Sequence, residues 1–146
     1  MRKTLSFALF SIALLSAVGA RAQNPNYNVG PVWRVTYIHL KPAQGNAFGN
    51  DVRQHLKPIG DEEKKQSLIM DYKIFTNPVA NQPNDWDVAI ATLYPNWAAL
   101  DQIDAKAFSI VEKHFGSREA ITEETRKRNE IGEVVASHLA HEVTPK

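Results

Sequence analysis

The sequence predicts an α+β domain in which four antiparallel strands form a sheet and helices cover one of its faces. Three observations predict this class. Segments rich in β-branched and aromatic residues alternate with segments whose apolar residues recur every three or four positions. Proline, glycine and asparagine separate these segments. The chain of 146 residues has no cysteine, which excludes disulfides, thiol nucleophiles and thiolate metal sites and leaves one ordinary core to hold the domain.

The first 22 residues are predicted to be a signal peptide. Arg2 and Lys3 form a basic start, residues 5–18 are apolar, and Ala20-Arg21-Ala22 has the small-x-small pattern of a cleavage site. The apolar run is shorter than the ~20 residues that a membrane helix needs, although an uncleaved anchor is the alternative. Cleavage near Ala22 predicts an exported protein, periplasmic or secreted, and no later segment is predicted to span a membrane.

Removing this leader changes the formal net charge from +1 to −2, because Arg2, Lys3 and Arg21 leave with it. A nucleic-acid-binding domain usually shows a clustered basic face, so the charge argues against that class. The basic triplet 126–128 follows three glutamates at helical spacing, which is typical of a solvated helix surface with ion pairs.

Residues 23–31 are polar and interrupted by two prolines and a glycine, so we expect a flexible N-terminal arm there and a single domain over residues 32–146. The domain begins with Val32–Leu40, which has strand composition and is stopped by Pro42. Alternation places Trp33, Val35, Tyr37 and His39 on one face, with Arg34, Thr36, Ile38 and Leu40 on the other. Neither face is purely polar, which predicts a central strand.

The next segment is predicted to be a helix, because Phe48, Val52, His55, Leu56 and Ile59 form one apolar stripe. Pro58 cannot sit inside a regular helix, so we expect a break near Lys57 and a second turn over 61–66 that begins with Asp61 as its N-cap.

Two further strands are predicted at Ile69–Thr76 and Trp86–Tyr94, joined by a long polar loop into a hairpin. Asn96 then suits the N-cap of a helix with one apolar face, Gly116 suits its end, and Ser117 suits the N-cap of a charged surface helix. The tail Ser137–Val143 is predicted to be a last strand, with helix continuation as the alternative.

The resulting βαββαβ order is the ferredoxin-like pattern, in which the strand order 4-1-3-2 places Val32–Leu40 in the middle of the sheet. The helices suffice for one face only. A second copy of the chain is the economical cover for the other face, so we expect a homodimer.

At this point the chain resembles the dimeric α/β-barrel superfamily, which includes antibiotic-biosynthesis-monooxygenase-like, EthD-like and NIPSNAP-like proteins. The resemblance rests on a first strand ending in Lys41-Pro42 with Gly45 soon after, and on a strand ending in Tyr94-Pro95-Asn96-Trp97. It covers residues 32–143, with Ala43 where the family more often has glycine. Members range from cofactor-free oxygenases and haem-handling enzymes to proteins of unknown role, so the resemblance implies a fold and leaves the activity open.

A set of aromatic residues around one imidazole is the candidate site. Trp33, Tyr37 and His39 share one face of the central strand, and we expect Trp86 and Tyr94 to share a face of its neighbour. Such rings suit a planar apolar ligand. His39 is the candidate base or ligand and Tyr37 the orienting group. The alternative is that these aromatics only fill an interface between sheets.

No metal site is predicted. His138 and His141 would share a face on a helix but not on a strand, and no acidic partner stands at a recognisable spacing from them. We expect His55 and His114 to be helix-packing residues, and Asp71 and Asp87 to be solvent-facing strand residues. The sequence lacks a phosphate-binding glycine loop and the common hydrolase motifs.

The sequence therefore favours an exported homodimer that holds a small, largely apolar or aromatic ligand between sheet and helices, with no cofactor expected. A cofactor-independent oxygenase or haem-related enzyme using His39 and Tyr37 is one alternative. A structural or interaction module without a small-molecule site is the other.

Overall fold

The computed structural model describes residues 26–80 and 85–146. The predicted signal peptide and the start of the predicted arm lie outside the described residues. The elements follow one another as β1 (Tyr27–Leu40), α1 (Gly45–Asp51), the π-helical turn η1 (Val52–Leu56), α2 (Lys57–Lys65), β2 (Asp71–Thr76), β3 (Val88–Tyr94), α3 (Trp97–Phe115), α4 (Arg118–Ile131) and β4 (Gly132–Pro145). This βαββαβ order confirms the predicted ferredoxin-like α+β class.

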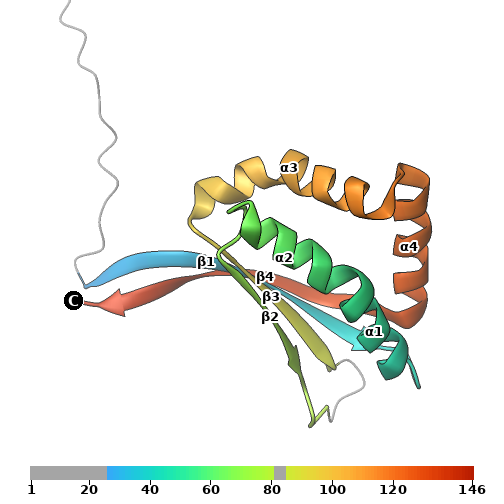
Figure 1. Ribbon diagram of the computed structural model, residues 1–146. Helices are drawn as coiled ribbons and strands as arrows, with labels where there is room; N and C mark the ends of the chain where they lie inside the picture. The colour runs from blue at the N-terminus through green and yellow to red at the C-terminus, as the bar shows by residue number, and fades with distance from the viewer. Residues whose placement is uncertain (1–25, 81–84) are drawn as a thin grey trace, which may run out of the picture.

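The four strands form one antiparallel sheet in the order β2-β3-β1-β4. This is the predicted order, with Val32–Leu40 in its middle. The tail is a strand, as predicted, because β4 pairs with β1 along most of its length. All of the helices lie on one side of the sheet, with α4 descending from the end of α3 to the start of β4 (Figure 1).

The predicted flexible arm is wrong for residues 27–31, which form the first part of β1. Tyr27 pairs with Pro145 and Val29 with Val143 before a bulge shifts the register. Beyond the helices, β1 and β4 continue together as a two-stranded ribbon that ends at the C-terminus (Figure 1). Polar composition failed to predict this strand because its backbone partner is the other end of the chain.

The first helical region does not break at Lys57 as predicted. It runs on from α1 into α2 through the η1 turn, in which the N–H of Lys57 donates to the carbonyl of Val52, five residues back. Wider π-type spacing lets the chain pass Pro58, which lacks an N–H and would crowd the carbonyl four residues earlier. Asp61 accordingly lies inside α2 and is not an N-cap.

The caps of the last two helices are confirmed. The side chain of Asn96 accepts a hydrogen bond from the N–H of Ala99, and that of Ser117 accepts one from the N–H of Ala120. Gly116 ends α3 with φ of 85°, a left-handed conformation that favours glycine.

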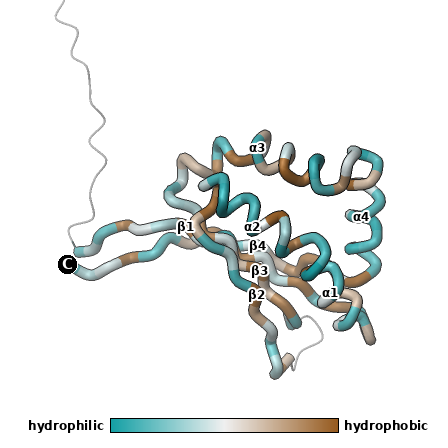
Figure 2. The backbone as a smooth tube through the Cα atoms, viewed as in Figure 1, coloured by the Kyte–Doolittle hydropathy of each residue, from teal (hydrophilic) through white to brown (hydrophobic). Residues whose placement is uncertain are grey.

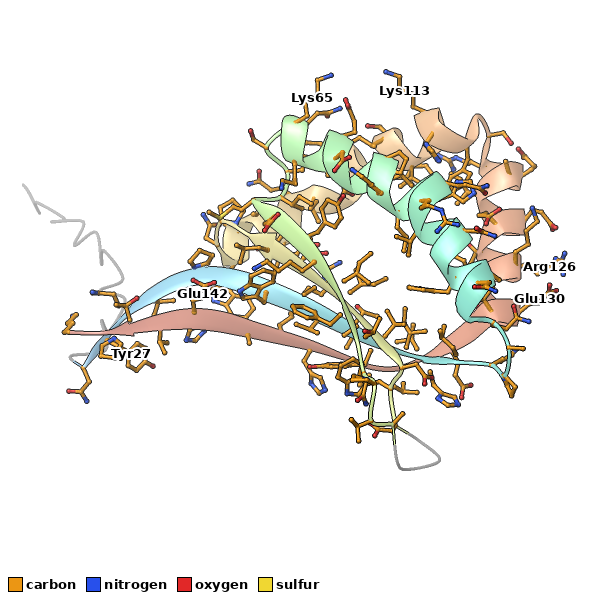
Figure 3. All side chains as sticks on the ribbon, turned by 60° about the horizontal axis from the view of Figure 1, so that its bottom comes forward. Tyr27, Lys65, Lys113, Arg126, Glu130 and Glu142 are labelled. Carbon is orange, nitrogen blue, oxygen red and sulfur yellow. The ribbon has the colours of Figure 1, made fainter. Side chains whose placement is uncertain are left out.

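The core lies between the sheet and α3. Val32 is fully buried and packs with Ile69, Tyr94 and Ile103, all at most 6% exposed. Helix α2 lies directly against the sheet at Gly60. A Cβ at this position would lie 2.8 Å from the ring of Tyr72. The helical layer turns a polar surface outward, where Lys65, Lys113, Arg126 and Glu130 project from it (Figure 3), and α4 is mainly hydrophilic (Figure 2).

The opposite side, which we call the open face, is covered by no described segment. It carries the odd-numbered residues of β1 from Trp33 to His39 and their neighbours on β2, β3 and β4. Phe75 and Val135 on this face are 48% and 40% exposed. Within the described residues, no helix is both long and apolar enough to cross a bilayer.

Candidate functional site

Four of the five predicted site residues lie on the open face. The rings of Tyr37 and Trp86 meet edge to face with centroids 5.4 Å apart, and Tyr37 meets His138 of β4 at 5.7 Å. Val135 and Ala136 complete a shallow hollow around these rings. His138 joins the set because it pairs with Val35 across the β1–β4 ladder.

His39 lies at the end of β1, held by the segment that leads into β3. Its Nδ1 is 3.0 Å from the carbonyl oxygen of Asp85 and 2.9 Å from Oδ2 of Asp87. Both of these atoms are acceptors, so we assign the proton to Nδ1 and leave Nε2 as the basic nitrogen. Asp87 also accepts from the N–H of Leu40 at 2.7 Å, so it orients the imidazole rather than facing solvent as predicted.

Trp33 lies farther along the same face, towards the ribbon. Its Nε1 donates to Oε1 of Glu142 on β4 at 2.8 Å, and the ammonium of Lys73 lies 5.4 Å above its ring. These contacts attach Trp33 of β1 to β4 and to the outer strand β2.

Tyr94 does not share a face with Trp86, which corrects the prediction. Tyr94 pairs with Val32 in the ladder, is 4% exposed and packs in the core under the helices, with the guanidinium of Arg34 5.1 Å from its ring. Trp86 precedes β3, which begins at Val88, so the alternation counted back from Tyr94 does not apply to it.

A cavity that the aromatic pattern did not predict lies on the other side of the sheet. It has a volume of about 290 Å³ and lies between the sheet and the helices α1, η1 and α4. Its apolar lining comes from both the sheet and the helices and consists of Ile38, Leu40, Phe48, Leu56, Ile90, Ile131 and Val134.

The polar corner of this cavity is an ion pair between Asp51 and Arg128. Nε of Arg128 lies 3.0 and 3.1 Å from the two carboxylate oxygens of Asp51, which is only 7% exposed. Nη2 of Arg128 is buried, and no hydrogen-bond acceptor reaches it from the part of the chain that the structure describes. A buried donor without an acceptor costs about 1–3 kcal/mol, so this corner of the described structure lacks one hydrogen-bond acceptor.

His55 lies behind this corner, on the η1 turn. Its Nδ1 is 3.0 Å from Nε2 of His114, its Nε2 is 3.8 Å from Oε1 of Glu124, and its ring stacks against Phe115 at 4.9 Å. The predicted packing role of His55 and His114 therefore describes only part of their contacts. The sequence did contain a signal for this ionisable cluster. Its residues stand four positions apart on helical segments, Asp51 with His55 and Glu124 with Arg128.

Further ionisable groups lie towards the β2 edge of the sheet. Burial raises the pKa of the Glu63 carboxyl, and the nearby charge of Arg34 opposes that rise. The pKa of Tyr72 is raised to about 12, first by partial burial and then by the hydrogen bond that its hydroxyl donates to Asp61. Lys64 holds the pKa of Asp71 low through a 2.7 Å contact on the surface.

Comparison with known proteins supports the fold and nothing beyond it. No family model matches the chain, and no curated protein matches it. Among solved structures, HapK from Hahella chejuensis superimposes with a TM-score of 0.51 at 15% identity, over 76% of this chain and 91% of HapK. A dimeric ferredoxin-like protein from an uncultured marine organism gives 0.42 at 13% identity, over 82% of this chain and 96% of its own. Only the first of these likenesses is close enough to support the ferredoxin-like fold.

Proposed function

We propose that this domain binds a small, largely apolar ligand with one anionic or acceptor group in the cavity between its sheet and the helices α1, η1 and α4. The observation that carries this proposal is the combination of a seven-residue apolar lining with the Asp51–Arg128 pair at one corner. Ligand sites in proteins typically combine an apolar wall with a few placed polar groups.

The size of the cavity favours a small ligand, because about 290 Å³ is at the lower end of the ~300–1,000 Å³ that ligand pockets usually occupy. Arg128 is the cation of the lining and Asp51 and Glu133 are its carboxylates, so a carboxylate or phenolate of the ligand would bind on the exposed side of Arg128. The side chain of Arg128 is 33% exposed, and its Nη2 has no hydrogen-bond acceptor among the described residues.

We further propose that two copies of the chain pair through their open faces, that the mature domain is exported after cleavage near Ala22, and that it belongs to the dimeric α/β-barrel superfamily. Half-buried aromatics and the exposed Phe75 and Val135 support the pairing. The open face also carries Lys73 beside Trp33, and Glu142 hydrogen-bonded to it. Opposite charges on one face allow a two-fold, self-complementary contact.

Calorimetric titration with 2-naphthoate, an aromatic carboxylate, tests the position of the site. Val134 and Val135 are adjacent on β4 and both exposed, at 64% and 40%, so either accepts a larger side chain. Val134 lines the cavity and Val135 lies on the open face. We expect Val134→Phe to weaken binding by tenfold or more, roughly the loss of one good contact, and Val135→Phe to leave it unchanged.

The reverse pattern would place the ligand on the open face, and no binding to the wild type would overturn the proposed ligand class. Native mass spectrometry of protein purified from its own host supplies a second test, since it reports retained ligand and oligomeric state together. Light scattering at micromolar concentration tests the pairing, and a folded monomer in that measurement would contradict the proposed dimer.

A second candidate function, proton abstraction at the open face as in a cofactor-independent oxygenase, is favoured by one observation. Asp87 and the carbonyl of Asp85 both accept from Nδ1 of His39, which leaves Nε2 as a base. This is the orienting contact that a catalytic histidine needs, and Tyr37 lies two residues away on the same face.

A further inference from the structure

Three metal-ligating side chains converge behind the polar corner of the cavity. One ligand atom from each of Asp51, His55 and Glu124 lies within 4.8 Å of the other two. The three come from the end of α1, the η1 turn and α4. All are shielded from solvent, with exposed side-chain fractions of 6%, 22% and 15%.

The contact between the two histidines couples the tautomer of His55 to that of His114. Nδ1 of His55 lies 3.0 Å from Nε2 of His114, so one of these nitrogens donates to the other. If Nδ1 of His55 donates, its Nε2 carries the lone pair and faces Glu124. A metal-binding histidine is usually fixed in this way, by an acceptor that takes the N–H of its other nitrogen.

The spacing of His55 and Glu124 suits a shared ion better than direct pairing. Nε2 of His55 is 3.8 Å from Oε1 of Glu124, too far for a hydrogen bond. Two ligands that bind one ion at about 2.1 Å each lie roughly 3.0–3.4 Å apart, so an inward movement of a few tenths of an ångström would complete the pair.

The charges around the cluster suit a divalent cation. Asp51 and Glu124 are the two carboxylates of the set. Arg128 contacts Asp51 from the side, as an outer partner that orients a ligating carboxylate. Lys127 lies 3.4 Å from the second oxygen of Glu124, but it is 53% exposed and therefore screened by water. One imidazole with two carboxylates favours a first-row transition ion over Mg²⁺ or Ca²⁺.

We propose that Asp51, His55 and Glu124 bind a divalent transition ion of the Zn²⁺ class, with His114 as a positioning residue that holds the tautomer of His55. Three protein ligands leave a coordination position for water, as in catalytic rather than structural zinc sites. The site goes beyond the proposed ligand-binding function. Metal binding is measurable without any cavity ligand, so the two proposals fail separately.

The test is titration of EDTA-stripped protein with Zn²⁺ alone, read by calorimetry and by metal content after dialysis. We expect about one ion per chain and a clear preference over Mg²⁺. Glu124→Gln keeps the size of the side chain and should weaken binding at least tenfold, and His55→Ala should do the same. His114→Phe should weaken binding by about tenfold although it removes no ligand, and His114→Gln, which retains an acceptor, should restore most of it.

The matched controls are His138→Asn and His141→Asn, which remove the exposed histidines of β4. Both should bind Zn²⁺ like the wild type. Loss of binding in these controls, full binding in Glu124→Gln, or no binding to the wild type would each overturn the proposal. Melting curves recorded in EDTA show whether each variant folds. If His55→Ala does not fold, the conservative Glu124→Gln decides the outcome.

Discussion

The two faces of the sheet differ in how they are completed. On the covered face, alternate residues of the central strands are closed off by the helices of the same chain, and Val32, Val88 and Tyr94 are at most 4% exposed. On the open face, Phe75 is 48% exposed, and the aromatic side chains of Trp33, Tyr37 and Trp86 are only partly buried. The sheet thus has one face that the helices of the same chain largely cover and one that no described segment covers, where burial of its exposed apolar area against a partner would be favourable.

The faces also differ in how they hold charge. The covered face contains the ion pair of Asp51 with Arg128 beside an apolar cavity, whereas the open face holds its charges at strand ends and edges. Removing one member of the Asp51–Arg128 pair should therefore lower the free energy of unfolding strongly. Removing a charged residue of the open face should lower it only slightly.

The largest effect is expected when the covered face is broken at Arg128. Arg128→Met leaves the 7% exposed carboxylate of Asp51 without its partner. A charge left uncompensated in a buried pair costs about 3–5 kcal/mol, and we expect about 3 kcal/mol because Arg128 is itself partly exposed. Urea unfolding measures this loss.

The matched control on the same helix is Arg126→Met. Arg126 pairs with Glu123 and Glu130 on the surface of α4, so the melting temperature should hardly change. Equal losses in the two variants would show that the covered face does not depend on its buried pair.

A smaller effect is expected where α2 touches the sheet. Gly60→Ala places a Cβ 2.8–2.9 Å from ring carbons of Tyr72, which must then move. Overpacking of this kind costs about 1–3 kcal/mol, partly offset by the better helix propensity of alanine, so we expect a net loss of about 1 kcal/mol.

Gly49→Ala in α1 is the matched control, because its Cβ would meet only the guanidinium of Arg53 at 3.6 Å. It should stabilise the protein by up to about 1 kcal/mol. Thermal unfolding of both variants checks the pair, and stabilisation by Gly60→Ala would contradict the close contact of α2 with Tyr72.

On the open face, His39→Gln should change stability by under about 1 kcal/mol, because glutamine can still donate to Asp85 and Asp87 and no core volume is lost. If His39 is the base of an open-face site, turnover should fall while the melting temperature holds. His141→Gln is the control, because His141 lies on β4 opposite Val32 and outside the open-face set. A large loss of stability with unchanged affinity for any ligand would remove His39 from the site and assign it to packing.

The smallest effect concerns the pH dependence contributed by Tyr72. Its pKa of about 12 in the folded protein is above the ordinary value near 10. A raised folded pKa contributes stability that is fully present below pH ~10 and is lost as pH rises towards ~12. The unfolding free energy of the wild type should therefore fall more steeply over this window than that of Tyr72→Phe. Because the hydroxyl of Tyr72 meets Asp61 in a solvent-exposed contact, the difference should be about 0.5 kcal/mol, and parallel curves would contradict it.

The sequence by itself determined the order of the elements and the position of Val32–Leu40 in the middle of the sheet. It also determined the caps at Asn96 and Ser117 and the glycine that ends α3. These features follow from local signals. Capping needs side chains within three residues, and strand alternation is visible in nine residues.

Only the tertiary structure decided where distant segments meet. Residues 27–29 became a strand because residues 143–145 pair with them, and the helix passed Pro58 through the η1 turn. Tyr94 entered the core while Trp86, outside the pleat of β3, joined Tyr37. The cavity corner brings Asp51 to Arg128, 77 positions away. No local pattern records such an approach, because it depends on how whole elements pack.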